Sequence, residues 1–507
     1  MENQNVLPLD VKGLHIHFVG IKGTGMAALV EILFAQGAVI TGSDVSERFY
    51  TDEILEKLGL KALSFSESNI TKDIQYVIYS SAYNVEKCPD LIAAKKMGLP
   101  LLLYTEALGE VSKAAFSAGI CGVHGKTTTT GLTGTILKSL DLPSQVLAGS
   151  IISSFGNSCT MTSPSFEKDK KHYFVAETCE YQRHFMSFCP SIILLTSVES
   201  DHQDYYPTYE SIRDAFVDYV CKLPLGGTLV YCEDDKGAKE VMNLAKSRRN
   251  DIRTVGYGEN AIGEYKLTFV NDVNDLTFDS QKIKLTTGRQ YFYIQKLGLC
   301  SLQVPGAHNA RNACGAVALC NELLKADGKN PDDYKEKIKA SLLDFAGGKR
   351  RSEIVGRAKT QNGEEVIVLD DYGHHPTAIK TTLSGFKDFY KEHKIIVDFM
   401  SHTYSRTEAL LEEFASCFTS ADIVIINKIY ASARENALNA KVSGKLLSER
   451  AKTYSKDVRY AEEFSEAAEI ILEELKKPSG TKGGYLVVTM GAGDNWKVGK
   501  MILEALK

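Results

Sequence analysis

The feature that most constrains this chain is a glycine-rich turn at residues 118–130, with the sequence A-G-I-C-G-V-H-G-K-T-T-T-T. An apolar run at 114–120 precedes the turn, and a segment with amphipathic helical spacing follows it at 131–140. A strand that enters a glycine turn and continues as a helix directs backbone N–H groups toward a phosphate. The turn therefore predicts a triphosphate site in an α/β domain, and the expected ligand is ATP with Mg²⁺.

The side chains of this turn have separate expected roles. The Lys126 ammonium is placed to neutralise the outer phosphates, and the Thr127 hydroxyl is placed to bind Mg²⁺. The expected ATP-binding residues of the turn are Gly122, Val123, His124, Gly125, Lys126, Thr127 and Thr128. The strict pattern G-x-x-x-x-G-K-T is not met, because Ile120 stands where the first glycine belongs. The alternative is a chance Gly-Lys-Thr at a threonine-rich helix start, which the flanking strand and helix disfavour.

Chain length and composition limit the class of protein. A chain of 507 residues exceeds what one core serves at about 100–200 residues per domain, so three domains are expected. No apolar run reaches the roughly 20 residues of a membrane span, so no membrane insertion is expected. A net charge of −5 argues against a general nucleic-acid partner. The eleven cysteines form no C-x-x-C pair and the N-terminus lacks signal-peptide character, which together favour the cytoplasm.

The N-terminal segment predicts a second nucleotide site. Residues 14–26 read as a strand, a turn containing Gly20, Gly23 and Gly25, and the start of a helix. A second short strand, 38–44, ends at an acidic residue that could accept a ribose hydroxyl. Another apolar run, 76–84, contains a pair of serines that could equally belong to an ordinary strand-end turn. We therefore expect a Rossmann-like unit over residues 1–110, with a dinucleotide as the standard first hypothesis.

Two strand ends in the central segment carry candidate metal ligands. The strand 172–177 ends at Glu177, where a phosphate-binding fold usually places its second Mg²⁺ ligand. The buried strand 191–198 is followed by an acidic cluster that contains His202. This histidine is a candidate ligand for a second Mg²⁺, and the alternative is a helix-capping cluster with a solvated imidazole.

The end of the central segment carries a candidate adenine site. Short alternating runs between residues 264 and 303 predict a small antiparallel excursion. Polar residues at 305–313 then precede an apolar helix at 314–324. Asn309 and Asn312 are expected to hydrogen-bond adenine or its ribose, since a simple helix cap needs only one of them.

The third segment repeats one pattern four times. Apolar strands at 366–369, 395–397, 423–426 and 485–489 are each followed by polar residues. Such repetition predicts a parallel sheet with one functional edge. The polar groups that follow these strands are Asp370–Pro376, His402–Arg406, Ala433–Glu435 and Gly491–Asp494.

These motifs occur in an order that resembles the Mur ligases of peptidoglycan synthesis. The order is G-I-K-G-T-G-M, G-S-D, G-V-H-G-K-T-T-T-T, G-A-H-N-x-x-N-A, D-D-Y-G-H-H-P, H-T-Y-S-R-T, S-A-R-E-N and G-A-G-D. The resemblance spans nearly the whole chain and is nearest to the members that join L-alanine to UDP-N-acetylmuramate. It implies three α/β domains: a Rossmann-like UDP-substrate domain (1–110), a P-loop ATP domain (111–344) and a Rossmann-like amino-acid domain (345–507).

The resemblance also implies residue roles. For amino-acid binding it implies Tyr372, His374 and Arg406, and for metal binding Thr127, Glu177 and His202. Catalysis is implied for Lys126, His202, His374 and Arg406, with either histidine as the base. The UDP-substrate residues that it implies are Gly20, Gly23, Thr24, Gly25, Met26, Asp44, Ser80 and Ser81.

Three positions depart from the family pattern. Residues 177–184 read E-T-C-E-Y-Q-R-H where many relatives read E-A-D-E-S-D, which leaves Glu177 secure and Glu180 less so. Phe216 stands where other members carry a carbamylated lysine, so no lysine carbamate is expected. Thr403 replaces an arginine common in relatives, which leaves Arg406 as the motif cation for the amino-acid carboxylate.

The implied reaction is ATP-dependent amide formation through an acyl phosphate, with Mg²⁺ as cofactor. Three alternative functions compete with this reaction. A nicotinamide oxidoreductase leaves the Lys126 region unexplained, and a nucleotide-dependent switch leaves the histidines and arginines of the third domain without a use. A ligase that recycles an intact tripeptide onto UDP-N-acetylmuramate is the nearer alternative, and the motif G-I-K-G-T-G-M favours the alanine-adding members.

Overall fold

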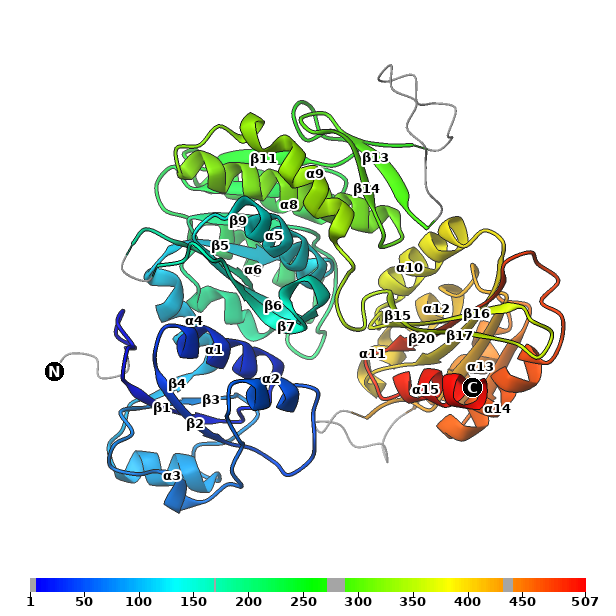
Figure 1. Ribbon diagram of the computed structural model, residues 1–507, viewed down its shortest axis with the longest axis horizontal. Helices are drawn as coiled ribbons and strands as arrows, with labels where there is room; N and C mark the ends of the chain where they lie inside the picture. Colours follow the sequence, from blue (N-terminus) through cyan, green and yellow to red (C-terminus); the bar gives the residue numbers. More distant parts are fainter. Residues whose placement is uncertain (1–5, 168–169, 271–287, 432–440) are drawn as a thin grey trace.

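The computed structural model describes residues 6–167, 170–270, 288–431 and 441–507. Three sheets dominated by parallel strands, each flanked by helices, follow one another along the chain, and a small antiparallel sheet accompanies the second (Figure 1). The predicted three-part α/β fold is therefore confirmed. Among the helices of the described residues, none combines the length and apolar character needed to traverse a bilayer.

The first sheet is fully parallel, with the strand order β2-β1-β3-β4. Its helix α1 is apolar and packs against strands β6 and β7 of the second sheet. The apolar core is consequently continuous from the first sheet into the second. The elements are β1 (His15–Val19), α1 (Thr24–Ala35), β2 (Val39–Ser43), α2 (Asp52–Lys57), β3 (Tyr76–Tyr79), α3 (Pro89–Lys96), β4 (Leu101–Leu103) and α4 (Tyr104–Lys113).

The second sheet has the order β11-β10-β9-β5-β8-β6-β7, and only β7 runs antiparallel to its neighbour. Its strands are β5 (Phe116–Cys121), β6 (Ser144–Ile152), β7 (Ser158–Thr162), β8 (Tyr173–Glu177), β9 (Ile192–Leu195), β10 (Thr228–Cys232) and β11 (Arg253–Tyr257). Its helices are α5 (Lys126–Leu140), α6 (Tyr209–Val220), α7 (Lys236–Arg248), α8 (Ala307–Ala326) and α9 (Lys335–Asp344). The expected antiparallel excursion is the sheet of β12 (Leu267–Phe269), β13 (Gln290–Ile294) and β14 (Gly298–Leu302).

The third sheet has the order β15-β16-β20-β17-β18-β19, parallel except for the edge strand β15. Its apolar cores contain residues of the C-terminal part alone. The strands are β15 (Glu353–Lys359), β16 (Glu365–Asp371), β17 (His393–Met400), β18 (Ile423–Asn427), β19 (Val458–Ala461) and β20 (Gly484–Gly491). The helices are α10 (Pro376–Phe389), α11 (Tyr404–Ala409), α12 (Leu411–Ser416), α13 (Gly444–Ala451), α14 (Phe464–Leu475) and α15 (Trp496–Ala505).

Two details differ from the sequence expectations. The strands that precede His374 and Arg406 follow each other along the chain, but in the sheet β20 lies between β16 and β17. Helix α8 begins at Ala307, so Asn309 and Asn312 lie inside the helix rather than before it. The S-A-R-E-N motif, residues 432–436, lies outside the described residues.

Candidate active site

The glycine turn of the second sheet connects β5 to α5, as the sequence predicts. Gly122 and Gly125 have φ angles of 134° and 85°, in the region that disfavours side chains. A Cβ atom at Gly122 would lie 2.1 Å from Thr196 Oγ1, and one at Gly125 would lie 2.6 Å from Asn312 Oδ1. Both glycines are therefore required because the turn is held closely between the end of β9 and helix α8.

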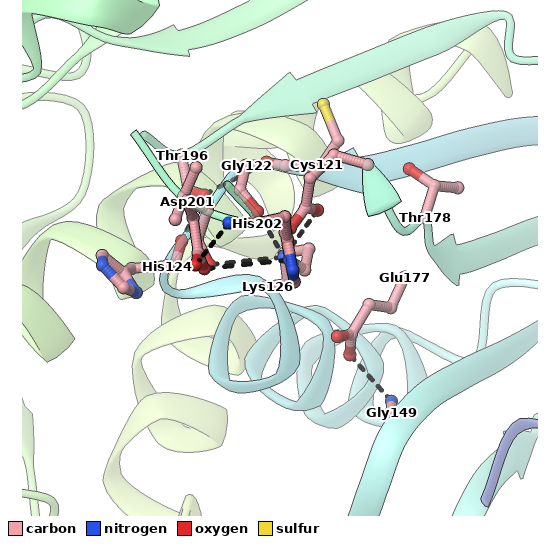
Figure 2. A network of polar contacts seen from close by, with 12 residues as sticks. Cys121, Gly122, His124, Lys126, Gly149, Glu177, Thr178, Thr196, Asp201 and His202 are labelled. Atoms are coloured by element: carbon pink, nitrogen blue, oxygen red, sulfur yellow. Dashed lines mark hydrogen bonds and ion pairs between the residues drawn. The ribbon is translucent and has the colours of Figure 1, made fainter. Parts of the chain in front are cut away.

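Lys126, the first residue of α5, folds back over this turn (Figure 2). Its Nζ donates hydrogen bonds to the carbonyl oxygens of Gly122 and Val123 and to Glu180 Oε2, the last at 2.8 Å. Burial opposes the charge on Lys126, but the neighbouring Glu180 carboxylate outweighs it and raises the pKa of Lys126. A fully charged ammonium therefore lies directly over the glycine turn.

Glu180 connects Lys126 to His202. Its Oε1 atom lies 3.3 Å from His202 Nε2, and the side chain is almost completely buried. Burial would raise the pKa of Glu180, but the charge of Lys126 and the hydrogen bond with His202 hold it below the ordinary glutamate value. The sequence left this residue in doubt, and in the structure it pairs with two of the expected catalytic side chains.

Thr127 and Glu177 form the second pair at the turn. Thr127 Oγ1 donates to Glu177 Oε1 at 3.1 Å, and the backbone N–H of Gly149 donates to Glu177 Oε2 at 2.8 Å. Figure 2 shows the Glu177 side chain directed toward Gly149 rather than toward Lys126. A hydroxyl and a carboxylate oxygen at this distance are donors suited to Mg²⁺, which prefers oxygen ligands.

Arg406, which follows a strand of the third sheet, contacts the central segment next to His202. Its Nη2 atom donates to Asp201 Oδ1 at 2.9 Å, although the two residues are 205 positions apart in sequence. Asp201 also accepts from the backbone N–H of His202 at 2.7 Å. The charge of Arg406 outweighs burial and holds the pKa of Asp201 well below its usual range. The Nε atom of Arg406 has no hydrogen-bond partner among the described residues.

His374 and Tyr372 follow β16 as Arg406 follows β17, so all three come after the carboxyl ends of parallel strands. The Nδ1 atom of His374 lies 2.9 Å from the carbonyl oxygen of Tyr372, and the two rings pack edge to face. Burial and the nearby Arg406 charge lower the pKa of His374 well below its ordinary value. His374 is therefore neutral near pH 7 and able to accept a proton, whereas His202 shares the carboxylate of Glu180.

A cavity of about 230 Å³ opens at the glycine turn of the first sheet. Six of the eight residues expected there line it: Gly23, Thr24, Gly25, Met26, Ser80 and Ser81. Gly20 and Asp44 are not among its lining residues. Asp44 instead accepts hydrogen bonds from the backbone N–H of Lys22 at 2.7 Å and from Tyr83 Oη at 2.8 Å.

A neighbouring cavity of about 130 Å³ leads from this turn toward Glu177. Gly25 and Glu177 both line it, together with Tyr104, Cys179 and His184. Tyr104 and His184 line both cavities, and sequence reasoning did not select either of them. His184 stands in the segment where the chain departs from its family pattern, and that departure is the available sequence signal.

The other expected ATP residues lie around the turn. The backbone N–H groups of Val123 and His124 bond to Ser197, at 2.9 Å each, so they fix the turn to the end of β9. Asn309 Nδ2 donates to the carbonyl oxygen of Pro305 at 2.7 Å, and Asn312 lies against Gly125. Thr128 is half-buried in the first turn of α5.

Comparisons with known proteins agree across the whole chain. Three profiles match in succession: Mur ligase family, catalytic domain (residues 15–116); Mur ligase middle domain (120–320); and Mur ligase, glutamate ligase domain (350–493). The UDP-N-acetylmuramate–L-alanine ligase of Treponema pallidum (strain Nichols) is 44% identical over 506 residues, 99% of each chain. The ligase of the same name from Borreliella burgdorferi is 35% identical over 488 residues, 95% of this chain and 97% of its own.

Solved structures share the fold. The UDP-N-acetylmuramate-alanine ligase of Thermotoga maritima superposes with a TM-score of 0.71 at 22% identity, covering 97% of this chain and 99% of its own. A murein peptide ligase from Psychrobacter arcticus superposes with a TM-score of 0.61 at 20% identity and the same coverage. At 20–22% identity, these superpositions show a shared three-domain fold.

Proposed function

The chain belongs to the Mur ligase family, and from this premise we propose how its residues carry out the reaction. The enzyme is an ATP-dependent, ADP-forming ligase that joins L-alanine to the carboxylate of UDP-N-acetylmuramate in peptidoglycan precursor synthesis. Neither a nicotinamide oxidoreductase nor a nucleotide switch agrees with this membership. The names of the curated relatives favour alanine over an intact tripeptide as the amine substrate.

One observation supports the assignment of roles more than any other. Lys126 of the phosphate turn, Glu180 beyond β8, and Arg406 of the third sheet are joined through His202 and Asp201 into one buried chain of contacts. Lys126 and Arg406 are the cations at the two ends of this chain of contacts, and each pairs with a carboxylate of the central domain. We infer that ATP and the amino acid meet at this place.

We propose that the γ-phosphoryl group of ATP passes to the muramate carboxylate. A carboxylate is a poor electrophile, and its acyl phosphate is attacked by the alanine amine to give the amide and inorganic phosphate. The chain supplies position and charge rather than a covalent nucleophile. Lys126 neutralises the outer phosphates, and the turn residues 122–128 with Asn309 and Asn312 hold the nucleotide.

We propose that Thr127 and Glu177 hold one Mg²⁺ and that His202 is a ligand of a second. The paired oxygens of Thr127 and Glu177 suit a hard cation, and His202 lies across Lys126 and Glu180 from them. Bound Mg²⁺ supplies positive charge to the crowded phosphate oxygens. Glu177→Ala and His202→Ala are expected to raise the Mg²⁺ concentration needed for half-maximal turnover, and an unchanged activation curve in both variants removes them from the site.

The amino acid is assigned to Arg406, Tyr372 and His374. Arg406 uses one side of its guanidinium for Asp201, and its Nε remains available for the alanine carboxylate. His374, whose lowered pKa keeps the ring neutral near pH 7, and His202, which is bound to Glu180, are the two candidates to take the ammonium proton.

The three parts of the chain are assigned accordingly. Residues 1–110 bind the UDP substrate through the cavity at Gly23 and Ser80, residues 111–344 bind ATP, and residues 345–507 bind alanine. Gly20 and Asp44 shape the first turn rather than line its cavity. We place the enzyme in the cytoplasm, because ATP and UDP-sugars are made there and all eleven cysteines are free.

The test is phosphate release by the purified full-length protein. ADP, phosphate and UDP-N-acetylmuramoyl-L-alanine are expected only when ATP, UDP-N-acetylmuramate, L-alanine and Mg²⁺ are all present. L-serine, glycine and the cell-wall tripeptide replace L-alanine in parallel reactions, and mass spectrometry identifies each product. Phosphate release without an amide product contradicts the proposal.

A further inference from the structure

A second group of potential ligands lies beside the phosphate turn, and two of its three members, Glu199 and His375, have no role in the reaction described above. One atom each from His124, Glu199 and His375 lies within 4.8 Å of the other two. The three residues come from three elements: the turn before α5, the segment after β9, and the N-cap of α10. They therefore meet where the central domain faces the third domain.

The partners of these side chains leave ligand atoms available. His375 is 5% exposed, its Nδ1 faces the backbone N–H of Thr377 at 3.4 Å, and its buried Nε2 has no partner among the described residues. His124 Nε2 is in ion-pair contact with Glu199 Oε1 but is not aligned with it as a hydrogen bond. Thr377 Oγ1 donates to Glu199 Oε2 at 3.0 Å, which orients the carboxylate.

The charge states suit a cation. Burial opposes ionisation of Glu199, but His124 outweighs it and lowers the pKa of Glu199. Burial lowers the pKa of His375, so its ring is neutral near pH 7. An anionic carboxylate beside a neutral, unpartnered imidazole is a typical pair of metal ligands.

We propose that His124, Glu199 and His375 bind one divalent cation of the Zn²⁺ class. Two imidazoles and one carboxylate with a fourth position open to water form a common zinc ligand set, whereas Mg²⁺ prefers oxygen ligands alone. Ligand atoms around tetrahedral zinc lie about 3.3–3.5 Å apart, so the three side chains adjust by small movements when they bind the ion. This site is separate from Thr127, Glu177 and His202.

Binding at this site ties two domains together. His124 and Glu199 belong to the central domain and His375 to the third, whose apolar cores are its own. Polar pairs such as Arg406 with Asp201, and Thr377 with Glu199, join the two domains. The ion therefore adds a link that holds the third domain against the ATP turn and restrains their relative movement.

Cobalt binding tests this proposal without relying on activity. Tag-free, chelator-treated, nucleotide-free protein is titrated with Co²⁺ and followed by visible absorption, and Zn²⁺ is then added as a competitor. We expect one Co²⁺ per chain with the intense absorption of a four- or five-coordinate site, displaced by Zn²⁺. His375→Gln is expected to abolish the signal, and Glu199→Gln to weaken binding at least about tenfold, typical of losing a metal ligand.

Two control variants separate this site from others. His393→Gln, at another histidine of the third domain, and Glu177→Gln, in the proposed Mg²⁺ set, are both expected to keep the signal. Zn²⁺ is also expected to raise the Tm of the wild type and of His393→Gln but not of Glu199→Gln, which reports on the site independently if His375→Gln fails to fold. The proposal is overturned if the wild type gives no stoichiometric signal, or if Glu177→Gln loses it while Glu199→Gln keeps it.

Discussion

Two glycine turns in this molecule look alike in sequence and use their lysines differently. Each connects a parallel strand to a helix, the first at residues 20–26 and the second at 122–127. Lys22 precedes its helix by two residues and turns away from the cavity, donating to the carbonyl oxygens of Val45 and Glu47 at 2.9 Å each. Lys126 is the first helical residue and lies over its own turn, paired with Glu180.

The position of each lysine relative to the start of its helix therefore decides its role. Lys22 fixes the segment after β2 and lies 3.3 Å from Asp52, so its charge is used within the first domain. Lys126 is held by a carboxylate at the end of a neighbouring strand, where an incoming phosphate can share it. The first turn thus offers a neutral surface to its ligand, and the second offers a charged one.

Removing Lys126 is expected to have the largest effect. Lys126→Ala takes away the charge that we propose faces the transferring phosphoryl group, so kcat should fall about a hundredfold or more, as for other groups that stabilise transition-state charge. Phosphate release measures the loss, and calorimetry with UDP-N-acetylmuramate should show binding to the first domain retained. A folded variant with wild-type turnover would falsify this role.

Arg406 provides a second cation with the geometry of Lys126, since it also pairs with a central carboxylate. Arg406→Lys keeps the charge and loses the planar fork, so KM for L-alanine should rise roughly ten- to a hundredfold, as for a lost charge-assisted hydrogen bond. KM for ATP should change little. Steady-state kinetics with each substrate varied in turn provides the test, and equal shifts for all three substrates would assign Arg406 to structure.

Lys22 should affect stability rather than chemistry. Lys22→Met leaves the carbonyl groups of Val45 and Glu47 and the Asp52 carboxylate without their shared donor. We expect the free energy of unfolding to fall by about 1–3 kcal/mol, the usual range for an unsatisfied buried polar group, with kcat within about twofold of wild type. The control is Lys61→Met, at an exposed position, and urea unfolding is measured for both variants. A large loss of kcat in folded Lys22→Met would contradict the contrast between the two turns.

The smallest expected effect is the pH dependence of the Lys126–Glu180 pair. Because the folded-state pKa of Glu180 is lowered, its stabilising contribution is present above the ordinary glutamate pKa of about 4.3 and is lost as the pH falls below it. The difference in unfolding free energy between wild type and Glu180→Gln should therefore be constant between about pH 5 and about pH 7. Below that range it should shrink by at most about 1.4 kcal/mol per pH unit.

Urea unfolding at a series of pH values measures this difference. If this difference in unfolding free energy stays constant down to about pH 3.5, about one unit below the ordinary glutamate pKa, then the neighbours of Glu180 do not lower its pKa. Lys126→Ala should also abolish this loss of stability at low pH, because the charge that outweighs burial in lowering the pKa of Glu180 is then absent.

Much of the fold could be predicted from local sequence. Glycines at strand ends, apolar runs of strand length and amphipathic helices predicted the strands β1, β2, β3, β5, β8 and β9 close to their observed positions. These signals are local because strand and helix formation depend on neighbouring residues and on the period of apolar side chains. The antiparallel edge strands β7 and β15 carried no comparable signal, and neither did the insertion of β20 between β16 and β17.

The sequence by itself selected the side chains of the phosphate turn, together with Glu177, His202, His374 and Arg406, because each lies in a recognisable motif at a strand end. Only the tertiary structure decided how they pair. Glu180 joins Lys126 to His202, and Asp201 reaches Arg406 across 205 positions and two domains. Such pairs depend on how separate sheets are placed against each other, and that placement arises from packing and charge summed over whole domains rather than from any one segment.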